Sequence, residues 1–293
     1  MGLRIRTNVA SLNAQRNMGN STGAMQENIA KLSSGYRINK ASDDAAGLAI
    51  SETMRAKTRS LDVAKRNAAD GVSLVQTAEG SMNEVSNILI RMRELATQAS
   101  SDTIGNNERS YSNGEYVQLV NEIQRISNTT NFNGIPLLAG QEAVGDDKMF
   151  TIHVGAGDGS KENTDTIQIG VDRLKINVED LGLGTGSEIG PSEKGEAFTR
   201  DIAAQKLSVI DNALDKVASS RAYVGAQQSR LGSTINNLGV QIENLKSANS
   251  RIRDVDFAEE TAAFTQNKIL QQAGGSVLMQ ANQAPEVALS LLR

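Results

Sequence analysis

The sequence predicts a mainly α protein: a long antiparallel helical bundle or coiled-coil rod with a small β-hairpin region and with paired N- and C-terminal helices. Three observations lead to this fold class. One heptad repeat of apolar residues runs from Leu207 to Ile252, and a second repeat with almost the same spacing runs from Leu61 to Ala96. The composition agrees, because 3% aromatics and 3 prolines in 293 residues suit long helices packed through aliphatic side chains.

The two repeats are expected to bury their seams against each other. Apolar residues recur at alternating steps of three and four, and only Arg221, Gln228 and Asn249 interrupt the C-terminal repeat. Helices of roughly 45 to 60 residues extend about 70 to 90 Å at a rise of about 1.5 Å per residue, which predicts a rod. The apolar seam positions are Leu61, Ala64, Ala68, Val72, Val75, Ala78, Met82, Val85, Leu89, Met92 and Ala96, then Leu207, Ile210, Leu214, Val217, Val224, Leu231, Ile235, Leu238, Ile242, Leu245 and Ile252.

The first helical segment, residues 1–33, is weakly amphipathic and rich in Asn and Gln. A helix with so few apolar residues is marginal alone. Residues 33–40 break the pattern, and the polar side chains of residues 42–44 provide N-caps for a helix over about 45–100. The strongest apolar residues of the first segment are Val9, Leu12, Ile29 and Leu32.

The middle of the chain changes its periodicity. A shorter helix through residues 116–126 ends at a turn signal, Asn-Phe-Asn-Gly, at 131–134. From there to about residue 191 the period is two, with candidate strands at 150–154 and 166–169 around a loop rich in Gly and Asp. We expect residues 139–196 to form a short β-hairpin and solvated surface loops, as the only β region.

The C-terminal part begins with the seam helix, over about 197–250. Asp256, with Glu259 three residues later, then resembles a capping box that starts a last helix. Gly274-Gly275 and Pro285 interrupt that helix. Both ends of the chain are thus apolar enough to need a partner and too irregular to fold alone, and such segments become ordered on assembly. The apolar residues of the last segment include Ile269, Leu270, Val277, Leu278, Leu291 and Leu292.

Residue types for catalysis or metal binding are scarce. His153 is the one histidine and cysteine is absent, so no catalytic triad and no histidine or thiolate metal site is expected. The glycine-rich stretch 155–161 lacks the Gly-Lys-Ser/Thr ending of a phosphate loop. The acidic residues Asp146, Asp147, Asp158 and Glu162 lack the spacing of a calcium loop. We expect no enzyme, no cofactor and no metal.

Charge and hydropathy exclude further classes of partner. The formal net charge is −4, and no basic block is dense enough for nucleic acid. No segment is long and apolar enough to insert into a membrane. The N-terminal residues lack the apolar core of a secretory signal, so export would need another route.

Several blocks of residues resemble the signature sequences of bacterial flagellins. At the N-terminal end these blocks are residues 8–13, 31–39, 43–50, 66–71 and 91–96. At the C-terminal end they are residues 250–256, 269–274 and 289–293. The resemblance spans about residues 1–140 and 197–293, so the chain looks like a minimal flagellin with only a short central insert.

The resemblance implies a structural subunit that polymerises into the flagellar filament for swimming motility. Residues 1–42 and 252–293 would be inner-core helices, disordered in the monomer and carrying the polymerisation residues of both terminal segments. Residues 43–138 and 197–251 would form the long-helix outer-core domain, with 139–196 as the surface region. Such subunits are exported unfolded by the flagellar type III route, are secreted and assemble at the filament tip. The implied partners are further copies of the chain, an export chaperone, the export apparatus, and the cap and hook-junction proteins.

The resemblance also implies recognition by a host Toll-like receptor through Arg91, Leu95 and Glu122. The position before Arg91 is commonly Gln in the family and is Ile90 here. Equally, these residues could be ordinary helix-surface residues that make filament contacts. Two other functions remain open at this point: a hook-filament junction protein of the same assembly, and an autonomous coiled-coil scaffold. A metalloprotease flagellin is excluded, since the sequence has no His-Glu-x-x-His.

Overall fold

The computed structural model describes residues 7–140, 149–157, 165–184, 189–190 and 200–290. The chain forms two compact units. One contains Met1–Thr58 and Glu243–Arg293, and the other contains Arg59–Ile242. The four acidic residues considered above for calcium lie outside the described residues, as do Leu291 and Leu292. The mainly α fold class is confirmed.

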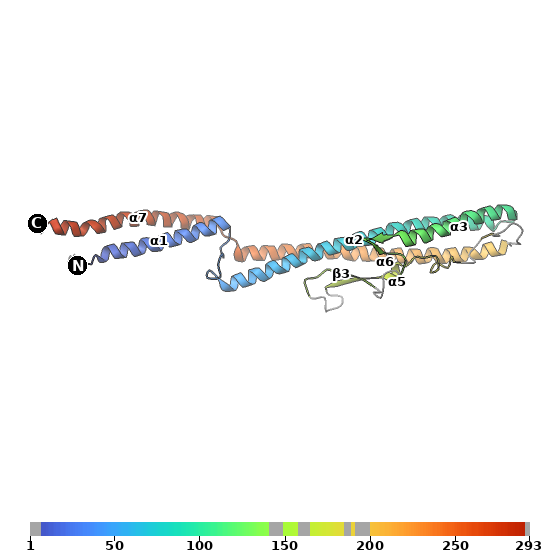
Figure 1. Cartoon of the computed structure of the whole chain (residues 1–293), viewed down its shortest axis with the longest axis horizontal. Helices are drawn as coiled ribbons and strands as arrows, with labels where there is room; N and C mark the ends of the chain where they lie inside the picture. The colour runs from blue at the N-terminus through green and yellow to red at the C-terminus, as the bar shows by residue number, and fades with distance from the viewer. Residues whose placement is uncertain (1–6, 141–148, 158–164, 185–188, 191–199, 291–293) are drawn as a thin grey trace. The chain divides into compact units, whose positions relative to one another are not determined.

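The terminal unit contains two helices that lie side by side, α1 (Val9–Ser34) and α7 (Phe257–Ser290) (Figure 1). The predicted pairing of the N- and C-terminal helices is therefore confirmed. Asn8 caps α1 by accepting the backbone N–H of Ser11 at 3.1 Å, and Gly35 ends the helix with a left-handed φ of 73°. Asp256 caps α7, because its carboxylate accepts the backbone N–H of Ala258 at 2.8 Å.

The larger unit is built on α3 (Asn106–Thr129) and on most of α2 (Ala45–Ala99) and α6 (Arg200–Arg253); the start of α2, up to Thr58, and the end of α6, from Glu243, belong to the terminal unit. Within this unit α2 and α6 are antiparallel: Arg93 pairs with Asp211 at 2.7 Å, and Gly71 lies near Leu231. The predicted seams form the core. Fully buried members include Ala68, Val75, Met82, Leu89 and Met92 on α2 and Ile210, Val217, Val224 and Leu231 on α6.

The turn between α2 and α3 is closed by a buried arginine. Arg109 donates from Nε to the carbonyl of Ala99 at 2.8 Å and from Nη2 to the carbonyl of Ser101 at 2.9 Å. The last carbonyls of a helix have no partner within the helix. Arg109 supplies that partner and fixes the start of α3 against the end of α2.

A small hairpin follows α3, where the sequence predicted only a turn. Strand β1 (Asn131–Phe132) pairs with β2 (Ile135–Pro136). Asn133 and Gly134 have φ values of 52° and 81°, the left-handed pair that a two-residue type I′ turn requires. The prediction that the chain has only one β region is therefore wrong, since residues 131–136 form a separate two-stranded sheet.

The predicted hairpin in the middle of the chain is confirmed. Strand β3 (Met149–His153) pairs antiparallel with β4 (Thr166–Gly170). Two side chains attach it to the helices: Asn67 Nδ2 donates to the carbonyl of His153 at 3.0 Å, and the hydroxyl of Tyr223 accepts the N–H of Gly170 at 3.0 Å. Most of the glycine-rich loop between the strands, residues 158–164, lies outside the described residues.

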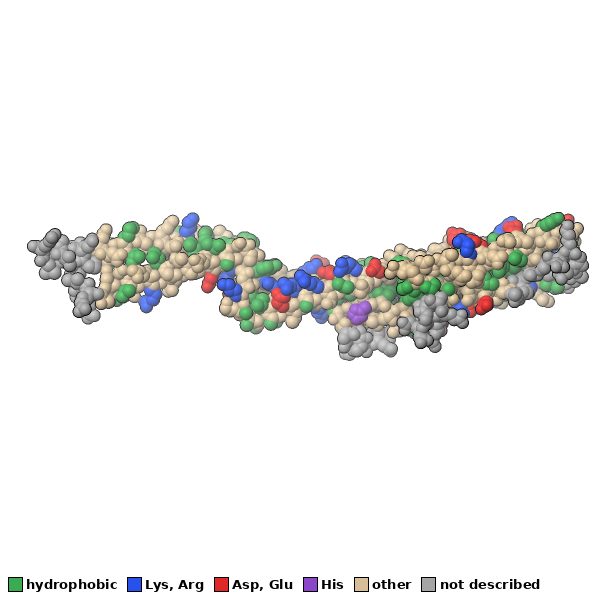
Figure 2. All heavy atoms as spheres, viewed as in Figure 1, with side chains coloured by type: hydrophobic (Ala, Val, Ile, Leu, Met, Phe, Trp, Pro, Cys, Tyr) green, Lys and Arg blue, Asp and Glu red, His purple; other side chains and the backbone are tan. Residues whose placement is uncertain are grey.

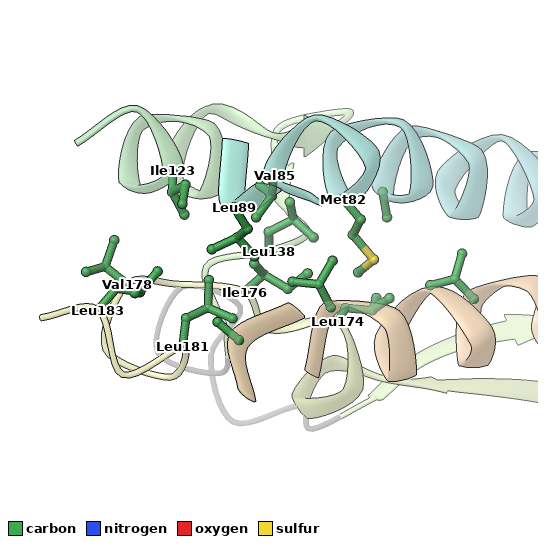
Figure 3. Packing of buried hydrophobic residues seen from close by; sticks show 14 of the residues in the cluster. Met82, Val85, Leu89, Ile123, Leu138, Leu174, Ile176, Val178, Leu181 and Leu183 are labelled. Carbon is green, nitrogen blue, oxygen red and sulfur yellow. The ribbon is translucent and has the colours of Figure 1, made fainter. Parts of the chain in front are cut away.

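The prediction that residues 139–196 form solvated surface loops is wrong for much of this segment. After β4, the short helix α5 (Val171–Leu174) and the following chain place their apolar side chains in the core of the larger unit (Figure 3). The acidic and glycine residues that suggested solvent exposure alternate with these apolar ones. Residues buried in this way are Ile167, Ile169, Val171, Leu174, Ile176, Val178, Leu181, Leu183 and Ile189.

Helix α7 continues through Gly274-Gly275 and position 285, where the sequence predicted interruptions. Gly274 faces Met18 of α1, and a Cβ atom on Gly274 would lie 3.7 Å from Cβ of Met18, at ordinary van der Waals distance. Packing against α1 therefore outweighs the low helix propensity of the two glycines.

Candidate assembly surface on the terminal helices

The interior of the α1/α7 pair is polar and small. The buried residues of α1 are Ser11, Ala14 and Asn28. Hydrogen bonds cross the interface at several levels: Asn8 Nδ2 donates to the carbonyl of Ala281 at 2.7 Å, and Ser11 Oγ donates to Asn282 Oδ1 at 2.8 Å. Most amphipathic helices turn such residues toward water. In this pair they face the partner helix.

The apolar side chains of the same helices point outward. The predicted polymerisation residues Val9, Leu12, Ile29, Ile269, Leu270 and Val277 are 46 to 59% exposed, whereas Leu32 and Leu278 are half-buried. Figure 2 shows apolar side chains on the visible face of both helices. Two more exposed apolar residues of α7 were not predicted from the sequence as polymerisation residues: Phe257 is 58% exposed and Met279 is 65% exposed.

A shallow apolar groove runs along one face of α7. Its volume is about 800 Å³, and all the residues that line it belong to this helix. Soluble proteins rarely leave a continuous apolar face uncovered, so such a face marks an interaction surface. The lining residues are Phe257, Ala258, Thr261, Ala262, Thr265, Gln266, Ile269 and Leu270.

The segments that connect these helices to α2 and α6 are joined by backbone hydrogen bonds. The N–H of Val255 donates to the carbonyl of Gly35 at 3.0 Å, and the N–H of Arg37 donates to the carbonyl of Arg253 at 2.6 Å. Asp43 then closes the turn before α2. Its carboxylate accepts the backbone N–H groups of Lys40 and Asn39, and these bonds lower the pKa of Asp43 below its ordinary value.

One arginine side chain organises this connection. The guanidinium of Arg253 lies over the ring of Tyr36, 4.6 Å from the ring centroid, and Nη1 pairs with Glu52 at 2.7 Å. Glu52 also pairs with Arg55 at 2.6 Å. Such an arrangement holds the end of α6, the start of α2 and the chain after α1 in one place.

Comparisons with known proteins match both ends of the chain. The family described as "Bacterial flagellin N-terminal helical region" matches residues 5–143, and "Bacterial flagellin C-terminal helical region" matches residues 207–292. A flagellin of Halalkalibacterium halodurans is 46% identical over 290 residues, which are 99% of each chain. A flagellin of Bacillus subtilis is 42% identical over 304 residues, which cover 99% of this chain and all of that one.

The chain belongs to the bacterial flagellin family. It is a structural subunit of the flagellar filament and not an enzyme, as membership of this family of structural proteins establishes. The junction-protein and scaffold alternatives are not favoured. A solved structure described as a flagellar hook-associated protein of Vibrio parahaemolyticus has a TM-score of 0.60 and 15% identity. The match covers 72% of this chain and 100% of the solved chain, and at this identity it shows a shared fold alone.

The three residues expected at a receptor site are not equally accessible. Arg91 is half-exposed on α2, where hydrogen bonds to Glu115 and Glu94, each at 2.9 Å, raise its pKa. Leu95 is 2% exposed and belongs to the core. Glu122 pairs with Arg125, which lowers the pKa of Glu122. The carboxylate that the structure brings to Arg91 from α3 is therefore that of Glu115, and not that of Glu122.

Within the described ranges, no three acidic or histidine side chains gather where they could hold a metal ion. None of the helices in this part of the chain combines the length and apolar character that a membrane crossing needs.

Proposed function

We propose that the outward apolar faces of α1 and α7 are the polymerisation surface of this filament subunit. The observation that carries the proposal is the distribution of polarity: Ser11 and Asn28 are buried inside the pair, while Val277 and Ile269 are exposed. An isolated helix pair gains little stability from such an arrangement, because its apolar side chains stay in contact with water. In a filament, neighbouring copies cover these faces, and heterologous contacts that do not close into a ring extend without limit.

The same faces link the ordering of the terminal segments to assembly. Burial of apolar area stabilises by roughly 25 cal/mol per Å², and the exposed side chains of α1 and α7 gain this only after a neighbour covers them. Until then the polar interior alone opposes the entropy of ordering the helices. We therefore expect the terminal segments to be disordered in free subunits and helical in the filament.

Point substitutions test the surface directly. Ile269→Ser and Val277→Ser each remove an exposed apolar group, and Val240→Ser removes an equally exposed one from α6 as the matched control. We expect each α7 variant to raise the critical concentration for seeded growth about 5- to 30-fold, the effect of roughly 1 to 2 kcal/mol per buried side chain. The control should change it less than about twofold. Equal critical concentrations for all three variants would contradict the proposal.

Export and its partners form a finer part of the proposal. The absence of cysteine and the weak terminal helices suit a chain that is threaded unfolded through the flagellar type III route, protected by an export chaperone that covers the apolar face of α7. The cap and hook-junction proteins would contact the same terminal helices at the ends of the filament. In cells that lack the flagellar export gate, the chain should stay inside. Appearance of the chain in the medium of such cells would exclude this route.

Receptor recognition is the remaining partner proposal. Arg91 and Glu122 are exposed and can reach a host Toll-like receptor, whereas Leu95 can contribute only by supporting α2 from the core. We expect Arg91→Ala to reduce activation in a reporter-cell assay at least about tenfold, as loss of a charged interface contact does. Glu115→Ala and Glu122→Ala, compared in the same assay, identify the carboxylate that matters. Unchanged activation by Arg91→Ala would remove this residue from the site.

A further inference from the structure

The α1/α7 interface buries one amide deeply. Asn28 is 7% exposed and lies against three residues of α7. With its nitrogen oriented toward Glu260, the amide donates to Oε1 of Glu260 at 2.9 Å, and its oxygen accepts from the N–H of Phe264 at 3.0 Å and from Nδ2 of Asn267 at 3.2 Å. Both atoms of the amide are thus satisfied, as a buried polar group requires.

We propose that Asn28, through Glu260 and Asn267, fixes the register of α1 on α7 and is the specificity-determining residue of this helix pair. The inference rests on the proposed function of the pair as the assembly surface. A single buried Asn between helices selects one register at a cost in stability, because another register changes the partners that its amide finds on the second helix. The nitrogen of Asn28 also donates to the carbonyl of Ala24 in its own helix at 3.0 Å, so the partners that depend on register are those on α7.

The other buried residues of α1 cannot select a register as well. Ser11 and Ala14 are small, and small side chains pack nearly as well after one helix slides along another. The remaining links described across the interface are the long ion pair of Lys31 with Glu260 at 3.9 Å and single hydrogen bonds, such as Gln271 to Thr22 at 3.3 Å. The amide of Asn28, in contrast, has three partners on α7, and one of them, Glu260, is charged.

A slip of α7 by one heptad along α1 would change the partners of Asn28. It would place Asn267 where Glu260 now lies and Gly274 where Asn267 now lies. Asn28 would exchange the charged acceptor Glu260 for the neutral amide of Asn267, and no side chain would stand at the position that Asn267 now fills. Lys31, whose Nζ is 3.9 Å from Glu260, would lose its partly buried partner as well. Loss of a hydrogen bond to a charged group shifts an equilibrium about tenfold or more.

Register matters for assembly because the two apolar faces belong to different helices. Val9 and Ile29 lie on α1, and Ile269 and Val277 lie on α7. A one-heptad slip moves one face about 10 Å along the other, at about 1.5 Å per residue. A neighbouring copy would then meet a stepped surface. Asn28 therefore aligns the two halves of the assembly surface.

Cysteine cross-linking measures the register, since the chain has no cysteine of its own. The pair Thr22→Cys with Gln271→Cys reports the observed register, and Thr22→Cys with Leu278→Cys reports a one-heptad slip. Each variant is added to filament seeds together with an excess of the parent chain, so that filaments form, and the pelleted filaments are cross-linked, because the terminal helices are ordered there. With Asn28 present, the observed register should give at least about tenfold more cross-link.

Asn28→Leu should reduce this ratio below about threefold, because a leucine packs in either register. Asn20→Leu, at an exposed position of the same helix, is the matched control and should leave the ratio unchanged. A ratio for Asn28→Leu equal to that of the control would overturn the inference. Growth is scored separately: normal growth of Ile269→Ser contradicts the proposed function, whereas an unchanged cross-link ratio contradicts the register claim alone.

A charge-based variant covers the case in which Asn28→Leu disturbs folding. Asn28→Asp brings a second carboxylate against Glu260 and should lower the cross-link ratio about tenfold. Adding Glu260→Gln restores a donor to this site, and the double variant should recover most of the ratio. Failure of Glu260→Gln to restore it would show that Glu260 is not the partner through which Asn28 acts.

Discussion

Gly71 of α2 lies directly against Ile152 of β3: a Cβ atom on Gly71 would be 2.4 Å from Cδ1 of Ile152. The hairpin therefore packs on the helix at a position where the helix has no side chain. Gly80, two and a half turns further along α2, has no atom within 4 Å of an added Cβ and is the matched control.

We expect Gly71→Ala to be less stable than Gly80→Ala by about 1 to 3 kcal/mol, the usual cost of overpacking. Gly80→Ala should be more stable than the parent chain by up to about 1 kcal/mol, because alanine favours the helix. Urea unfolding followed by circular dichroism gives both values. If both variants were stabilised equally, the hairpin would not depend on this contact.

Arg253 is expected to hold the connection between the terminal helices and the rest of the terminal unit. Arg253→Ala removes the contact with Tyr36 and the ion pair with Glu52, and it should destabilise the connection by about 1 to 2 kcal/mol. Limited proteolysis within residues 35–44 should accelerate about 5- to 30-fold. Arg251→Ala, which loses only a contact with Ser247, is the control. Equal cleavage rates for the two variants would argue against a special role of Arg253.

Asp43 should titrate below its ordinary pKa of 3.8, because two backbone N–H groups hold its carboxylate in the ionised form. A depressed pKa contributes stability that is present above pH 3.8 and is lost as the pH falls through the lower folded value. The stability difference between the parent chain and Asp43→Asn should therefore be constant near neutral pH and shrink in acid. An NMR titration of Asp43 that gives its ordinary value would contradict the turn described before α2.

The long helices could be predicted from the sequence because their periodicity directly reflects burial. Leu89 and Val224 recur in heptads and lie in the core. Ile176 and Leu183 could not be placed in the same way, because they belong to irregular chain among glycine and acidic residues, and only tertiary packing decides which side of such a segment faces inward. Local composition therefore indicated solvent where the structure has core.

The proposed assembly surface rests on the same kind of signal. Val9 and Ile269 stand out as apolar residues without a partner, and the structure leaves them exposed. Asn28 could not be found this way, since a polar residue in a polar helix carries no signal until its partner helix is known. Glu115 was missed for a related reason: its proximity to Arg91 depends on how α3 packs against α2.

The most direct test of the assembly surface is removal of the helices that carry it. Chains lacking residues 1–30 or residues 265–293 are added to filament seeds, and growth is followed by sedimentation and electron microscopy, with circular dichroism as the control for folding of residues 59–242. We expect soluble helical subunits that do not extend the seeds. Filaments of normal length from either shortened chain would contradict the proposed assembly surface.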